Sequence, residues 1–186
     1  ATNWNPWRQW DSVYAPPCLP AFIGDKGGAL EPGITSTQWN MVVSFYGQQQ
    51  TDGWINDASA KGSNQLRTLN DIQKYFNSHA MMYGRKLALA YATEASATAD
   101  ESTQRSDVTD AIGKYHPIAA QVEGSEAEIN EWSKNKVVND SWLSPIESVY
   151  QRNKPWSWSQ TSPTFAARLT AEWVCKQLKG YKPIPG

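Results

Sequence analysis

The residues of this sequence with the clearest chemical potential are its glutamates and tryptophans. A glycan-cleaving enzyme needs two carboxyl groups beside the sugar bond and aromatic rings that stack on sugar faces. Glu147, in the segment SPIESVY, is the best single candidate for an acid, because its apolar neighbours Ile146 and Val149 would raise its pKa. The simpler interpretation is that the glutamates are solvated on helix surfaces. The carboxyl groups considered are those of Glu94, Glu101, Glu126, Glu128, Glu131 and Glu147.

Tryptophan is abundant, with 10 among 186 residues. Two clusters, NWNPWRQW near the start and KPWSWSQ near the end, lie in segments without a regular helical or strand pattern. Large aromatic side chains with an arginine among them are typical of interface hot spots. We therefore predict that these residues contact a surface, which is the chain's own body, a neighbouring subunit, a glycan or a membrane interface. They are Trp4, Trp7, Arg8, Trp10, Trp156 and Trp158.

Other catalytic chemistry has no sequence support. The two histidines, His79 and His116, are far apart, and the chain has no HExxH, GxSxG or phosphate-loop motif. We therefore predict no catalytic residue, no metal site and no cofactor, and interpret the protein as non-enzymatic. The net charge of -1 argues against nucleic-acid binding. No apolar run reaches the roughly 18 residues of a membrane span.

The cysteines bear on the compartment. Cys18 and Cys175 are the two cysteines of the chain, and in an oxidising compartment we expect them to form a disulfide. The alternative is two buried free thiols. The sequence begins with Ala1, which is consistent with a cleaved signal peptide or with a trimmed methionine. Low charge and many Trp, Asn, Ser and Thr residues favour an extracytoplasmic protein, periplasmic or secreted, or a virion-associated one.

The elements that would position these groups are mostly helices. Residues 1–35 are rich in proline and glycine and predict an irregular N-terminal arm, followed by a helical domain over 36–186. The strongest pattern is an apolar stripe with steps of three and four over 64–98, which predicts one long helix. A last helix is expected to begin at Thr164 and to stop at Gly180. Shorter helices are expected after Ser36, over 107–115, in pieces over 118–138, and from Pro145. The polar segment 99–107 is expected to be a loop or the turn of a hairpin.

No convincing alternating strand is found, since the one candidate, MVVSFY, sits in a helical pattern. We therefore predict a mainly α fold, an elongated helical bundle or a long helical hairpin with a Trp/Pro-rich arm. The favoured function is that of a structural or assembly subunit that associates with itself or with other subunits, as in a secretion, conjugation or phage-particle machine. The alternative is a glycan-directed protein that binds or cleaves cell-wall sugars with exposed tryptophans and a glutamate.

Overall fold

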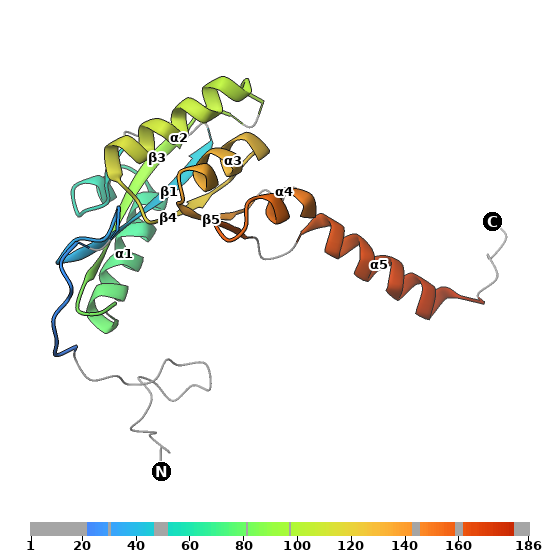
Figure 1. The fold of residues 1–186 in the computed structure, drawn as a ribbon, viewed down its shortest axis with the longest axis horizontal. Coiled ribbons are helices and arrows are strands. Elements are labelled where there is room, and N and C mark those ends of the chain that lie inside the picture. The colour runs from blue at the N-terminus through green and yellow to red at the C-terminus, as the bar shows by residue number, and fades with distance from the viewer. Residues whose placement is uncertain are drawn as a thin grey trace, which may run out of the picture.

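A six-stranded sheet lies at the centre of the molecule (Figure 1). The computed structural model describes residues 22–29, 31–46, 52–80, 82–96, 98–142, 146–158 and 162–180. In this part of the chain the strand order is β2-β3-β1-β4-β5-β6, and all neighbours are parallel except β2, which runs antiparallel to β3 at one edge. The strands are β1 Gln38–Tyr46, β2 Gly53–Trp54, β3 Lys86–Glu94, β4 Ala119–Val122, β5 Val138–Ser141 and β6 Ser157–Trp158.

Helices cover both faces of this sheet. Helix α1 packs on one face through Leu66, Leu69 and Phe76, which meet the side chains that β1 and β3 direct to that face. Helices α2 and α3 pack on the other face, where Val108 and Trp132 are fully buried. Their bounds are α1 Asn64–His79, α2 Glu101–Tyr115, α3 Glu126–Lys134, α4 Glu147–Arg152 and α5 Pro163–Leu178, with a short 3-10 turn over Ser59–Lys61.

The segment expected to begin a helix after Ser36 is the central strand β1. Val42 belongs to the core under α2 and α3, while Val43 belongs to the core under α1. A parallel strand covered on both faces reads as a continuous apolar run instead of an alternating one. MVVSFY therefore lacks the period-two signal, which is why the helical interpretation was wrong.

The predicted long helix over 64–98 is two elements. Helix α1 ends at His79, and β3 runs from Lys86 to Glu94. Between them the chain reverses through Tyr83 and Gly84, which both have positive φ. The apolar steps of three and four continue through this turn into KLALAYATE, but those residues are buried on both sides of the sheet. Sheet pairing with β1 overrides their helical propensity.

The mainly α prediction, an elongated helical bundle or hairpin, is therefore wrong, and the fold is α/β. The segment 99–107, expected as a loop, contains the first turns of α2, capped by Asp100. The segment 118–138, expected as helical pieces, contains the strand β4 before the helix α3.

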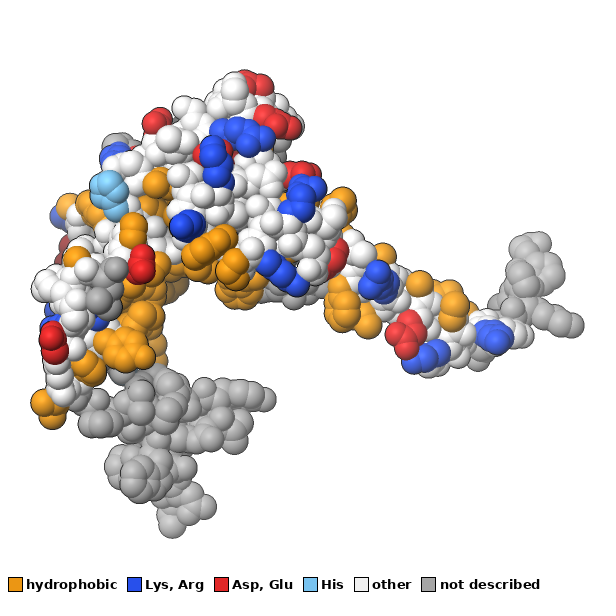
Figure 2. All heavy atoms as spheres, in the orientation of Figure 1, with side chains coloured by type: hydrophobic (Ala, Val, Ile, Leu, Met, Phe, Trp, Pro, Cys, Tyr) orange, Lys and Arg blue, Asp and Glu red, His pale blue; other side chains and the backbone are white. Residues whose placement is uncertain are grey.

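The last helix, α5, was predicted correctly, but it projects from the body of the molecule (Figure 1). None of its residues is buried, and hydrophobic side chains are visible along it in Figure 2.

The segment before β1 is held by a buried arginine. Arg85 Nε donates to the Thr35 carbonyl oxygen (2.7 Å), and Arg85 Nη2 donates to the carbonyl oxygens of Lys26 and Gly28. Three backbone acceptors thus satisfy a cation that is almost fully buried. The division into an arm over 1–35 and a domain over 36–186 stays a prediction, because residues 1–21 lie outside the described part of the chain.

Candidate functional site

The topology singles out one place on the sheet for a ligand. After β1 the chain crosses through α1 to β3 on one side, whereas after β4 it crosses through α3 to β5 on the other side. In open parallel sheets, ligands bind outside the carboxyl ends of the strands at such a topological switch point. Here that point lies between the ends of β1 and β4, next to Tyr46 and the loop that begins at Glu123.

Two buried glutamates lie at this place. Glu94 is the last residue of β3 and is 2% exposed, and Glu128 lies in the first turn of α3 and is fully buried. Ser44 Oγ donates to Glu94 Oε1 (2.7 Å). Tyr46 OH donates to Glu128 Oε2 (2.5 Å), and the Ser125 amide donates to the same oxygen (2.6 Å). We call Glu94 and Glu128 the carboxyl pair.

The local sequence explains how the carboxyl pair is positioned. Ser44 and Tyr46 alternate with Phe45 on β1, so both hydroxyls are on the face that carries α2 and α3. Ser125 and Glu128 form a capping box, in which each side chain accepts a hydrogen bond from the other residue's backbone N–H. Glu128 thus helps to cap the N-terminus of α3 and also lies at the switch point.

Each member of the carboxyl pair keeps one oxygen without a partner. Glu94 Oε2 and Glu128 Oε1 are buried and accept no hydrogen bond from the described residues. Burial, and then the charge of Glu128, raise the pKa of Glu94 to about 8, and Asp107 and Glu123 add to the effect. Burial also raises the pKa of Glu128, against the hydrogen bonds from Tyr46 and Ser125. Glu94 therefore holds a proton at neutral pH.

Two further carboxylates lie near the pair and accept hydrogen bonds from backbone amides at the ends of the strands. Glu123 Oε2 accepts from the Tyr46 amide (2.9 Å), and Asp107 Oδ2 accepts from the Ala95 amide (2.7 Å). The loop between β4 and α3 is fixed by Gly124, which has φ +73 and whose Cβ, if present, would lie 2.5 Å from Ser141 Oγ. The switch point is therefore acidic, and its backbone is closely packed.

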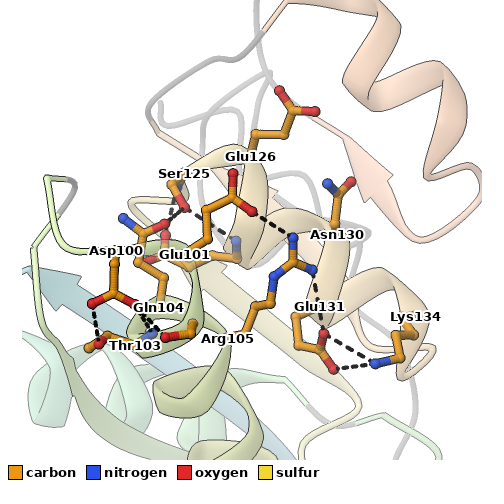
Figure 3. A network of polar contacts seen from close by, with 12 residues as sticks. Asp100, Glu101, Thr103, Gln104, Arg105, Ser125, Glu126, Asn130, Glu131 and Lys134 are labelled. Carbon is orange, nitrogen blue, oxygen red and sulfur yellow. Dashed lines mark hydrogen bonds and ion pairs between the residues drawn. The ribbon is translucent and has the colours of Figure 1, made fainter.

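A polar network joins the N-termini of α2 and α3 beside the carboxyl pair (Figure 3). Ser125 Oγ donates to Gln104 Oε1 (2.7 Å), and Gln104 Nε2 donates to the Ala99 carbonyl oxygen (3.1 Å). Asp100 caps α2 by accepting from the amide and the hydroxyl of Thr103, both at 2.9 Å. These bonds fix the two helix ends relative to each other, so the carboxyl pair is preorganised.

The nearby arginine of this network is already paired. Arg105 lies 3.0 Å from a carboxylate oxygen of Glu101 and 3.9 Å from one of Glu131, and Figure 3 shows it between them. Lys134 also pairs with Glu131. Among the described residues, no lysine, arginine or histidine forms an ion pair with Glu94.

The structure brings two of the residues singled out from the sequence together. Glu147 and Trp158 line one cavity of about 490 Å³ between α4, β6 and the start of α5, which we call the α4–β6–α5 cavity. Trp156, which precedes Trp158 by two residues, is half-buried and is not among the residues that line the cavity. The pKa of Glu147 is lowered, not raised, because Gln151 and Ser162 donate hydrogen bonds to its carboxylate. Trp4, Trp7, Arg8 and Trp10 lie outside the described residues.

The predicted disulfide is not present. Cys175 is an exposed free thiol on α5, and Cys18 lies outside the described residues. This finding contradicts the bridge and, with it, the use of a disulfide as an argument for the compartment. The alternative of a buried thiol is wrong for Cys175 as well.

Glu94 and Glu128 are both among the candidate carboxyl groups of the sequence, but no sequence pattern predicts that they lie together. Glu94 ends β3 and does not lie on the predicted long helix. The signal that could have found the site is the S-x-x-E spacing of Ser125 and Glu128, which marks a helix start shortly after the mainly apolar segment IAAQV.

The fold is that of a doubly wound, mostly parallel α/β domain, and the carboxyl pair lies buried at its switch point. Comparisons with protein-family models, with curated proteins and with solved structures found no match. Among the described helices, none is both long and apolar enough to cross a membrane. Within the same residues, no group of three His, Cys, Asp or Glu side chains is placed to hold a metal ion.

Proposed function

We propose that this chain is a ligand-binding domain that takes a small polar molecule with a cationic nitrogen at the carboxyl ends of β1 and β4. The observation that carries the proposal is the carboxyl pair at the switch point, with Glu94 Oε2 and Glu128 Oε1 buried and unpartnered. A buried carboxylate without partners is costly, and an ammonium or guanidinium group supplies the missing donors and charge.

The proton on Glu94 makes this binding depend on pH. With a pKa of about 8, Glu94 is protonated at neutral pH, and a cation must displace that proton to pair with the carboxylate. Affinity for a cationic ligand should therefore rise as the pH increases toward and beyond 8. A neutral ligand would not show this dependence.

Binding is favoured over catalysis by the placement of the reactive side chains. His79 ends α1 and His116 follows α2, so both histidines lie at the amino ends of β3 and β4, opposite the carboxyl pair. Cys175 is on α5. Among the described residues, the switch point thus offers carboxyl, hydroxyl and amide groups suited to recognition, and no histidine or cysteine that could act as base or nucleophile.

The test is a thermal-shift screen with small amines and guanidines, each matched to a neutral compound of similar shape. A compound that raises the melting temperature is then titrated by calorimetry at pH 6.5 and pH 9. We expect tighter binding at pH 9, and a loss of about tenfold or more with Glu94→Gln.

The control is Asp110→Asn, which removes an exposed carboxyl of α2 and should leave the affinity unchanged. The proposal fails if no cationic compound binds, or if Glu94→Gln binds the same compound as tightly as the wild type at both pH values.

A second function, contact with another copy of this chain, is favoured by α5. Phe165, Leu169 and Trp173 recur every four residues along this helix and are exposed. A row of exposed apolar side chains on a projecting helix suits an interface. Sedimentation velocity should give an oligomer for the wild type and a monomer for Leu169→Glu, with unchanged circular dichroism. A monomeric wild type contradicts this function.

A further inference from the structure

The α4–β6–α5 cavity has the features of a second ligand site. It lies at the β6 end of the sheet, with β5 between it and the switch point, and the function proposed for the carboxyl pair does not use it. The start of α5 is tied to the start of α4 by a hydrogen bond from the Glu147 amide to Thr164 Oγ1 (3.3 Å). This hydrogen bond therefore joins the two helices that form walls of the cavity.

Two residues that line this cavity carry a buried hydroxyl group without a partner among the described residues. Tyr150 and Ser157 are each 5% exposed, and both Tyr150 OH and Ser157 Oγ are buried with no hydrogen bond from the described residues. Most buried hydroxyls in folded proteins have a partner, and each can both donate and accept. A ligand with hydroxyl groups of its own would satisfy both.

Aromatic rings flank the same space. Trp158 is 54% exposed and Phe165 is 55% exposed, and both line the cavity. Such rings offer flat apolar faces on which the C–H face of a sugar ring can stack. Aromatic rings beside unpartnered hydroxyls match the mixed surface of a carbohydrate.

The charges of the cavity add a preference for an anion. The pKa of Glu147 is lowered, first by hydrogen bonds from Gln151 and Ser162 and then by the positive charges of Lys154 and Arg168. Both cations line the cavity, so two positive side chains face one negative one. One positive charge is left over, and a guanidinium binds a carboxylate with two parallel hydrogen bonds.

We propose that the α4–β6–α5 cavity binds an acidic sugar. The hydroxyls of the sugar pair with Tyr150 and Ser157, its ring lies against Trp158, and its carboxylate pairs with Arg168. This inference does not rest on the function proposed for the carboxyl pair, since the two sites share no residue.

The experiment uses saturation-transfer NMR and calorimetry with glucuronate, glucose and benzoate up to millimolar concentrations. We expect the wild type to bind glucuronate more tightly than either of the other two. Trp158→Ala and Arg168→Gln should each weaken glucuronate binding about tenfold or more. Trp142→Ala removes an exposed tryptophan outside the cavity and should leave the binding unchanged.

Tyr150→Phe provides a second variant that keeps the buried ring and removes only the hydroxyl, so weaker binding by this variant cannot be attributed to a cavity in the core. Each of three results overturns the proposal: no binding of glucuronate, equal binding of glucose, or binding of benzoate alone. Unchanged binding by Trp158→Ala overturns it as well. Circular dichroism of each variant checks that the fold is retained.

Discussion

Replacing Glu94 by glutamine should change the way in which the stability of the protein depends on pH. Glu94 is 2% exposed and has a pKa of about 8, against 4.5 for an ordinary glutamate. The folded state therefore keeps the proton over this interval, while the unfolded chain releases it. Because the unfolded state then binds fewer protons than the folded state, stability falls as the pH rises from 4.5 to about 8.

The size of this effect follows from the two pKa values. One pH unit corresponds to about 1.36 kcal/mol, so the interval from 4.5 to about 8 corresponds to a loss of about 5 kcal/mol. The contribution is fully present below pH 4.5 and is lost above pH 8. Glutamine has the shape of the protonated acid and never ionises, so the variant does not suffer this loss.

The assay is urea unfolding of the wild type and Glu94→Gln at pH 5 and pH 9 without ligand. At pH 5 we expect the two free energies of unfolding to agree within about 1 kcal/mol, and at pH 9 the variant should be more stable by up to about 5 kcal/mol. Asp110→Asn, on the exposed face of α2, should not gain stability over the wild type with rising pH. A difference between wild type and Glu94→Gln that is the same at both pH values refutes the reasoning.

Three further predictions concern the fold around the carboxyl pair. Trp132→Ala removes a fully buried side chain under α3 and should cost about 3–5 kcal/mol in guanidinium unfolding, where a loss below 1 kcal/mol contradicts the packing. Gly124→Ala should lower the melting temperature, because its φ is +73 and the added Cβ would meet Ser141 Oγ at 2.5 Å. The matched Gly113→Ala, inside α2 with open space around it, should raise the melting temperature, and an equal response of the two glycines argues against the described loop. Ser125→Ala breaks the capping box and the hydrogen bond to Gln104, and should cost about 1 kcal/mol in urea unfolding, while Ser125→Thr, which keeps a hydroxyl at the cap, should recover most of it.

Helix ends and helix caps can be predicted from the sequence because their causes are local. The last helix was predicted from its apolar spacing and from Gly180, and α5 ends at Leu178. The capping box is formed by Ser125 and Glu128, which are three residues apart in the sequence. Helix caps depend on neighbours within one turn, so the local sequence contains the necessary information.

The sheet could not be found in this way. β1 and β3 are neighbours in the sheet although α1 separates them in the chain, and both are covered on two faces by helices. Burial on both faces removes the alternating pattern, and the Ala and Leu residues of β3 also suit a helix. Only the distant partner decides between strand and helix for such a segment.

The candidate site belongs entirely to the tertiary structure. Glu94 and Glu128 come from two different strand–helix units, and their two free oxygens exist because the fold buries both carboxyl groups at one place. The same holds for the cavity that joins Glu147 to Trp158 across α4 and β6. The sequence by itself determined which acids and aromatic rings were available and where the local helix signals lie. The packing of the strands decided which of those groups meet, because desolvation and mutual charge act through space and not along the chain.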